Sequence, residues 1–130
     1  MIRVVIDTNV LVSALWSGGG NPANIVKLVS TVITPVFTED IFLEYVDVLN
    51  RPRFKFSTGK TNGLLLGLRK YGEIIEVVEK SLIPMVDETD RIFYDTARTS
   101  GAILVTGNRR HFPDESFIMT PSQFLQILKK

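Results

Sequence analysis

The feature that most constrains the fold of this sequence is a set of short β-branched runs that alternate with helical segments. The run at 4–6 is Val-Val-Ile and stops at Asp7, and the run at 102–106 stops at Gly107 and Asn108. Apolar runs of this kind are typical of strands that are covered on both faces. The sequence therefore predicts an α/β fold, a three-layer α/β/α sandwich with a central, mainly parallel sheet.

Caps, glycines and prolines place the individual elements. We expect strands at 1–6, 32–37, 102–106 and 117–119, with 74–78 as a strand or an extended connector. We expect helices at 10–16, from 21 onward, from 38 to about 50, at 64–71, 90–100 and 121–128. Thr38 and Thr89 are the expected caps of two of these helices, and Pro35 should place the second strand at a sheet edge or a strand end. The strands 1–6 and 102–106 should be neighbours at the centre of the sheet.

Composition limits the possible functions. The 130 residues suit one compact domain, 1–130, and the absence of cysteine excludes disulfides and thiolate metal sites. The sole histidine, His111, excludes a multi-histidine zinc site within one chain. Lys and Arg total 15 against 14 Asp and Glu, so the net charge indicates no partner. No apolar run approaches the roughly 20 residues that cross a bilayer, and no signal peptide pattern is present, so we expect a soluble, cytoplasmic protein.

Four polar side chains occupy comparable places in this predicted fold. Asp7 and Asn108 follow central strands, and Asp90 begins a helix that leads into one of them, so all three should lie at the carboxyl edge of the sheet. Glu44 lies within an apolar helix, where it either faces water or points into an acidic cluster that a metal neutralises. Oxygen ligands of this kind suit Mg²⁺ or Mn²⁺. The alternative for Asp7 is a simple helix cap.

Other phosphate and nucleophile motifs are missing. The glycines at 18–20 are not followed by Lys and Ser or Thr, and they do not complete a dinucleotide-binding pattern. A phosphatase-like hydrolase with Asp7 as nucleophile would need a second aspartate where Asn9 stands. That alternative is weaker than a metal site.

The sequence resembles PIN-domain nucleases, of the group that forms toxin components of prokaryotic toxin–antitoxin systems. The resemblance covers nearly the whole chain and rests on four motifs in order: 5–14, Glu44 with 48–52, Asp87 and Asp90 with 97–101, and 105–113 in a variant form. It implies a ribonuclease that depends on Mg²⁺ or Mn²⁺, with Asp7, Glu44 and Asp90 as metal ligands. It also implies a separately encoded antitoxin protein that blocks the site, and self-association as a homodimer or higher homo-oligomer.

Asn108 departs from the family pattern. Many relatives carry aspartate there, and others carry it three positions later, where His111 stands. An amide adds no negative charge, so a second metal would be held less tightly unless His111 supplies the missing ligand. Asp87 and Asp95 are candidates to compensate, although we expect Asp95 to be solvated because it lies off the helical face of Asp90.

The resemblance and the polar side chains together imply an endoribonuclease that cleaves RNA phosphodiesters by attack of water, with Asp7, Glu44, Asp90 and Asn108 as its catalytic residues. The residues expected to orient these side chains are Thr8, Asn9, Thr106 and His111. The residues expected to hold the RNA backbone, each with a solvated surface as the alternative, are Arg51, Arg53, Lys55, Arg109 and Arg110. A second hypothesis, which Asn108 favours, is a catalytically weak PIN-like module for RNA binding or assembly.

Overall fold

The structure, a computed structural model, describes residues 1–129. In chain order its elements are β1 (Ile2–Ile6), α1 (Thr8–Ser17), α2 (Gly20–Lys27), β2 (Ile33–Phe37), α3 (Glu39–Leu49), α4 (Thr58–Tyr71), β3 (Glu73–Ile74), α5 (Arg91–Ser100), β4 (Ile103–Val105), β5 (Ile118–Met119) and α6 (Pro121–Leu128). Short 3-10 turns lie at Pro52–Phe54, Glu88–Asp90 and Arg109–His111. Within residues 1–129 no helix has the length and apolar character that a membrane crossing requires.

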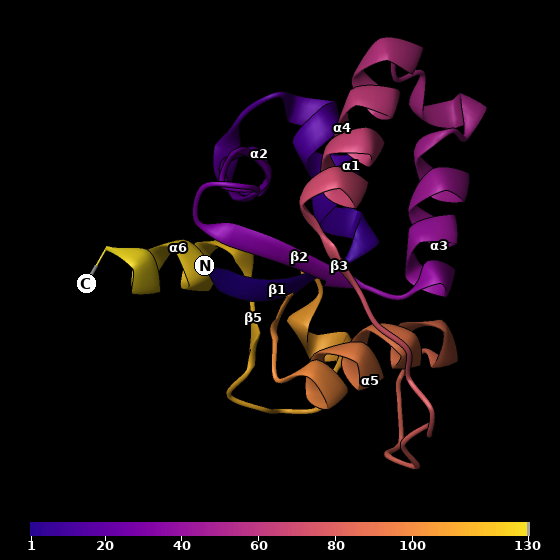
Figure 1. Cartoon of the computed structure of the whole chain (residues 1–130), viewed down its shortest axis with the longest axis vertical. Coiled ribbons are helices and arrows are strands. Elements are labelled where there is room, and N and C mark those ends of the chain that lie inside the picture. Colours follow the sequence, from indigo (N-terminus) through magenta and orange to yellow (C-terminus); the bar gives the residue numbers. More distant parts are fainter. Residues whose placement is uncertain (130) are drawn as a thin grey trace.

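The strands form one parallel sheet in the order β3-β2-β1-β4-β5. Val4 is in register with Ile103, and Ile6 with Val105, so β1 and β4 are neighbours at the centre, as the sequence predicts. Figure 1 shows α1 to α4 on one side of the sheet and α5 on the other. The predicted three-layer sandwich with a parallel sheet is therefore confirmed.

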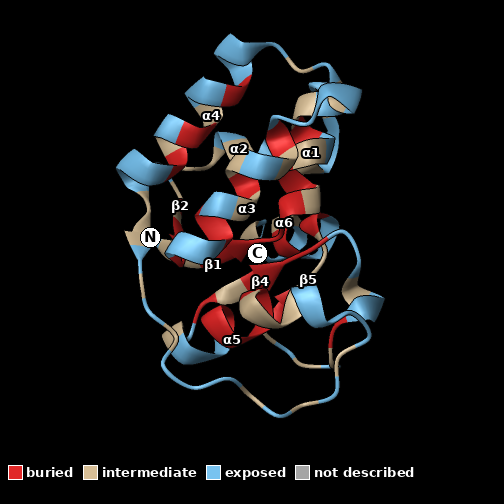
Figure 2. Cartoon of the chain, turned by 90° about the vertical axis from the view of Figure 1, so that its right-hand side faces the viewer, coloured by how far each residue is buried: buried red, intermediate tan, exposed pale blue. Residues whose placement is uncertain are grey.

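The central strands do not alternate apolar with polar side chains, because both of their faces are buried. The side chains of β1 from Val4 to Ile6 and those of Leu104 and Val105 in β4 are buried, because helices cover both faces. Figure 2 shows the buried residues concentrated in β1, β4 and the sides of α1 and α5 that face the sheet. This core holds the carboxyl ends of β1 and β4 in a fixed position next to each other.

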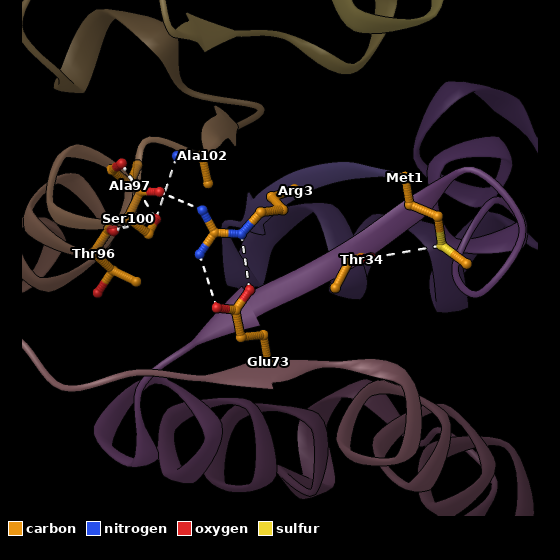
Figure 3. A network of polar contacts seen from close by, with 8 residues as sticks. All are labelled: Met1, Arg3, Thr34, Glu73, Thr96, Ala97, Ser100 and Ala102. Carbon is orange, nitrogen blue, oxygen red and sulfur yellow. Dashed lines mark hydrogen bonds and ion pairs between the residues drawn. The ribbon is translucent and has the colours of Figure 1, made fainter.

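The outermost strand β3 has only two residues, and an ion pair across the sheet helps to hold it. Arg3 of β1 donates from Nε and Nη2 to the two carboxylate oxygens of Glu73, at 2.8 and 2.9 Å (Figure 3). The third nitrogen of the same guanidinium donates to the carbonyl oxygen of Ser100, at the end of α5. A two-bond arginine–carboxylate pair fixes geometry as well as charge, so Arg3 links β3, β1 and α5.

Four predicted helix starts are wrong. Helix α1 begins at Thr8, two residues earlier than predicted. Helix α4 begins at Thr58, six residues earlier than predicted, because the Ser57 hydroxyl caps it by accepting from the Lys60 amide at 3.2 Å. Helix α2 begins at Gly20 and not at Asn21. Helix α5 begins at Arg91, after a 3-10 turn whose capping carboxylate is Asp87 rather than the hydroxyl of Thr89.

Contrary to the prediction from the sequence, Pro35 lies neither at a sheet edge nor at a strand end. Strand β2 lies inside the sheet, between β3 and β1, and Pro35 is in the middle of it, in register with Val4. The proline is tolerated because β3 pairs only with Val36 and Phe37, so Pro35 lies just before that pairing begins.

Gly72 lies where α4 passes into β3, and it has no room for a side chain. A Cβ atom there would lie 2.3 Å from Cε1 of the buried Phe37 and 2.4 Å from the carbonyl oxygen of Leu68. We expect Gly72→Ala to lower the free energy of unfolding by about 1–3 kcal/mol, measured by urea denaturation. Gly67→Ala is the control, because its Cβ meets nothing within 4 Å and alanine favours a helix interior by up to about 1 kcal/mol. Equal effects of the two substitutions would contradict the close approach.

Candidate functional site

Asp7 ends β1 and is the most buried carboxylate at the carboxyl edge of the sheet. Its residue is 6% exposed, and its Oδ2 accepts a hydrogen bond from the Thr106 hydroxyl at 2.7 Å. The backbone amide of Asp7 donates to the Val105 carbonyl oxygen at 2.9 Å, so β1 and β4 end side by side. Asp7 is in the N-cap position of α1, but its side chain makes no capping hydrogen bond. The simple cap interpretation is therefore not what the structure shows.

Glu44 points toward the same edge from the middle of α3. It is half-buried, and its Oε2 accepts a hydrogen bond from the hydroxyl of Thr8, the first residue of α1. The next residue, Tyr45, is buried and donates from its phenol to the Ile6 carbonyl oxygen at 2.5 Å. This contact fixes the rotation of α3 against the end of β1, so Glu44 faces Thr8 rather than only water. Sequence reasoning missed Tyr45 as the residue that positions Glu44.

Asp90 reaches the edge from the other layer, at the end of the 3-10 turn before α5. Its side chain is largely buried, and its pKa is raised by burial and by the negative charges of Asp87 and Glu44, although His111 opposes the shift. Nδ1 of His111 lies 3.9 Å from Oδ2 of Asp90, which is too far for a hydrogen bond. Asp87 is exposed and accepts hydrogen bonds from the amide and hydroxyl of Thr89.

The pKa of Asp7 shows that its charge is not balanced. It rises from 3.8 to about 6, first because of burial and then because of the negative charges of Asp90 and Glu44. Hydrogen bonds from the Thr106 side chain and the Thr8 backbone lower it only in part. Within residues 1–129 no cation contributes to this balance. A buried carboxylate with two like charges nearby is a position that a bound cation would stabilise.

The end of β4 is joined to the start of α1 by polar contacts. The buried hydroxyl of Thr106, which donates to Asp7, also accepts from the backbone amide of Asn108 at 3.0 Å. Oδ1 of Asn9 accepts from the Gly107 amide at 3.1 Å, and a Cβ at Gly107 would lie 3.3 Å from that oxygen. Asn108 itself is exposed and is linked to the site through its backbone amide.

The carboxylates of Asp7, Glu44 and Asp90 are ligands of the kind that a hard divalent cation prefers, although they do not surround a single position. Within residues 1–129 no three Asp, Glu or His side chains lie close enough together to hold an ion. The three predicted ligands share an edge, and the charges of Asp90 and Glu44 raise the pKa of Asp7, but the expected convergence of the carboxylates is not present. Their chemistry still fits, because all are oxygen donors, as Mg²⁺ and Mn²⁺ prefer, and the buried Asp7 has no balancing cation in the part of the chain that the structure describes.

The prediction that Asp95 is solvated is wrong. Asp95 is 4% exposed and accepts a hydrogen bond from the Ser81 amide at 3.1 Å. It lies beneath the connector between β3 and α5, which covers that face of the helix and which the helical spacing alone did not reveal. Its charge is not among those that act on Asp7 or Asp90, so it does not compensate for Asn108.

The five basic residues predicted to hold RNA differ in their surroundings. Arg51 pairs with Asp47 at 3.1 Å, and the guanidinium of Arg53 lies 4.9 Å from the ring centroid of Phe54. Arg109 is engaged in the fold, because it donates to the Ile118 carbonyl oxygen at 2.9 Å and to Asp114 at 3.2 Å. Those with exposed residues are Arg51, Arg53, Lys55 and Arg110.

Thr106→Val tests the hydrogen bond to Asp7 with little change in volume. Without the hydroxyl, the charged form of Asp7 loses a donor, so its pKa should rise further. We expect the metal-free protein to lose about 1–3 kcal/mol of unfolding free energy at pH 8 and less at pH 5, measured by urea denaturation. Thr61→Val is a matched control, because Thr61 is equally buried and its hydroxyl has no hydrogen-bond partner within residues 1–129. A loss at Thr106 that does not depend on pH would contradict the coupling to Asp7.

Comparison with known proteins shows the family to which the chain belongs. Residues 3–110 match the family model described as PIN domain, a span that includes Asp7, Glu44, Asp90 and Asn108 and ends just before His111. The chain belongs to the PIN-domain family, whose members are generally nucleases. It is 30% identical over 111 residues to the uncharacterized protein MJ1680 of Methanocaldococcus jannaschii, a match that covers 83% of this chain and 72% of that protein.

A solved structure shares the fold. It is the crystal structure of VapBC2 from Rickettsia felis bound to a DNA fragment from their promoter, with a TM-score of 0.58 and 19% identity. The match covers 92% of this chain and 97% of that chain. At this identity the likeness is one of fold.

Proposed function

We propose that this chain is an endoribonuclease that depends on Mg²⁺ or Mn²⁺ and cleaves RNA phosphodiesters by attack of water. One observation carries the proposal: Asp7 is buried, its pKa is raised to about 6 by burial and by the charges of Asp90 and Glu44, and no cation among residues 1–129 balances it. Membership of a family of nucleases supports the reaction class. We further propose that residues 1–130 form one domain that works in the cytoplasm as the toxin of a toxin–antitoxin pair.

In this proposal Asp7, Glu44 and Asp90 hold the ion. When bound, such an ion lowers the pKa of water and stabilises negative charge on the scissile phosphate. The chain itself orients the ligands, since the hydroxyl of Thr106 holds one oxygen of Asp7 and that of Thr8 holds one oxygen of Glu44.

The likeness in fold to a solved structure suggests the partners that we propose. The solved neighbour is VapBC2, bound to DNA from its promoter. By analogy we propose that a separately encoded antitoxin protein binds this chain and covers the edge of the sheet where Asp7, Glu44 and Asp90 lie, here called the acidic edge. Self-association as a homodimer or a higher homo-oligomer is part of the same proposal.

A second candidate is a catalytically weak PIN-like module for RNA binding or assembly. Two observations favour it. Asn108 is an exposed amide at a position where the family resemblance implies a carboxylate, and the carboxylates within residues 1–129 do not form a closed set of ligands.

Cleavage of single-stranded RNA separates the two candidates. We expect the wild-type chain to cut RNA with Mn²⁺, to stop when a chelator is added, and to resume when Mn²⁺ is restored in excess. The Asp7→Asn variant should show only the background seen with chelator. Wild-type protein that binds RNA but never cuts it would favour the binding module, and cleavage that survives the chelator would contradict the metal-dependent mechanism.

Asn108 and His111 are alternative sources of a further ligand. Asn108→Asp adds a carboxylate next to the backbone amide that binds Thr106, and after desolvation we expect it to tighten Mn²⁺ binding by about ten-fold. If the His111 ring is the ligand instead, His111→Ala should abolish cleavage and Asn108→Asp should change little. Calorimetric Mn²⁺ titrations of both variants distinguish these outcomes. If the Mn²⁺ affinity is unchanged in both variants, both side chains lie outside the metal site.

A further inference from the structure

A partly exposed aromatic cluster lies at the end of α1 that is farther from Asp7, Glu44 and Asp90. It consists of Trp16 at the end of α1 and of Phe54 and Phe56 between α3 and α4. The two phenyl rings stack, with centroids 5.3 Å apart and an interplanar angle of 8°. The indole meets both of them edge-on at 6.1 Å and is itself 65% exposed. A large aromatic ring is thus supported from one side and open to solvent on the other.

Basic side chains lie next to this cluster. Lys55 and Lys60 line a hollow of about 400 Å³ together with the three rings, and no acidic side chain lines it within residues 1–129. The Arg53 guanidinium lies 4.9 Å from the Phe54 centroid. Lys55 has a φ of 55°, a left-handed conformation that is uncommon for a residue with a Cβ, and it separates the two stacked phenylalanines. The chain therefore places a lysine, not a glycine, at a position where glycine would be least strained.

The cluster is connected to the acidic edge by α1 and α3. Figure 1 shows both helices on the same side of the sheet, and the hydrogen bond from Thr8 to Glu44 joins them at the edge. Trp16 lies eight residues beyond Thr8, which corresponds to about 12 Å along a helix. A stacked single strand that rises about 3.4 Å per nucleotide covers this distance in three to four nucleotides.

We propose that Trp16, Phe54 and Phe56, with Lys55 and Lys60, form a base-stacking subsite for single-stranded RNA, three to four nucleotides from the bond that is cut. This inference rests on the proposed function, because it defines the substrate of the same acidic edge. Alternating rings and cations match a strand whose bases are free to stack and whose phosphates are negative. A duplex keeps its bases inside and offers the open indole ring nothing to stack on.

The experiment uses the fact that Trp16 is the only tryptophan of the chain. A 12-nucleotide oligouridylate is added in the presence of a chelator, so that binding is measured without cleavage. We expect the strand to quench the fluorescence of Trp16 saturably, while an abasic strand of the same length quenches it little. By fluorescence anisotropy of labelled RNA, Trp16→Ala should weaken binding of the oligouridylate by about ten-fold or more and leave the abasic strand nearly unaffected.

Two control variants separate stacking from charge. Tyr71→Ala removes another exposed aromatic ring with a lysine beside it, since Lys70 lies 5.2 Å from the Tyr71 centroid, but outside the cluster. It should leave RNA binding unchanged. Lys60→Ala should weaken the base-bearing and abasic strands equally and reduce the salt dependence of both. Trp16→Phe keeps an aromatic face and should retain most of the affinity.

The outcomes also separate this inference from the proposed function. Quenching together with the Trp16→Ala loss, in a protein that never cuts RNA with Mn²⁺, would support the subsite and contradict the nuclease. Cleavage by a protein whose Trp16 is not quenched, and whose Trp16→Ala variant binds RNA as the wild type does, would overturn the subsite and leave the aromatic cluster to a protein partner.

Discussion

Asp7→Asn is expected to stabilise the metal-free protein and, at the same time, to abolish its cleavage of RNA. The carboxylate of Asp7 is buried, and its pKa of about 6 against an ordinary 3.8 means that ionising it in the folded protein is unfavourable. A shift of that size corresponds to about 3 kcal/mol at pH 8, of which an uncharged amide should recover about 1–3 kcal/mol. Urea denaturation with chelator measures the gain, and the RNA assay with Mn²⁺ measures the loss.

Asp47→Asn is the matched control for this substitution. Asp47 lies on α3, three residues from Glu44, but its side chain is 71% exposed and pairs with Arg51. Its removal should change the free energy of unfolding by no more than about 0.5 kcal/mol and leave cleavage intact. If Asp7→Asn instead destabilised the metal-free protein by 1 kcal/mol or more, the charge of Asp7 would already be balanced within the chain.

Mn²⁺ is expected to stabilise the protein strongly above pH 6 and weakly at pH 5. The pKa of Asp7 is higher in the folded than in the unfolded protein, so binding of a proton to Asp7 stabilises the fold. This stabilisation is fully present below pH 3.8 and is lost as the pH rises through about 6. An ion at this site competes with the proton, so its benefit grows over the same pH range. At a hundredfold excess over Kd, an ion that binds only the folded state adds about 2.7 kcal/mol. For a chain of this size that corresponds to roughly 10 °C in Tm.

Differential scanning fluorimetry with Mn²⁺ or chelator, from pH 5 to pH 8, measures this dependence. The Asp7→Asn variant should lose most of the Mn²⁺ effect at pH 8, whereas Asp47→Asn should keep it. A Tm increase of the same size at pH 5 and pH 8 would show that Mn²⁺ binds elsewhere than at Asp7.

The central part of the fold could be predicted from the sequence because its signals are local. The unbroken apolar runs of β1 and β4 identify buried parallel strands, and parallel strands bring their carboxyl ends to one edge, which places Asp7 near Thr106. The start of α4 was missed because Gly59 and Gly63 weaken its helical signal. Asp95 was misplaced because a connector distant in sequence covers it.

The site was predictable only in part, for a similar reason. Helical periodicity could not decide whether Glu44 faces water or the edge, since that depends on the rotation of α3 against β1. The phenol of Tyr45 and the hydroxyl of Thr8 determine that rotation, and both are contacts between segments far apart in the sequence. The meeting of Trp16 with Phe54 depends likewise on the lengths of α1 and α3, which no local motif specifies.

Calorimetric titration with Mn²⁺ at pH 7.5 tests most directly whether the three acids hold one ion. The proteins to compare are the wild type, Asp7→Asn, Glu44→Gln, Asp90→Asn and the control Asp47→Asn. We expect the wild type and the control to bind Mn²⁺ with the same affinity, and each of the other three variants to lose at least about ten-fold, as removal of a charged ligand should. Binding that is unchanged in all three variants, or reduced equally in the control, would contradict a shared metal site at Asp7, Glu44 and Asp90.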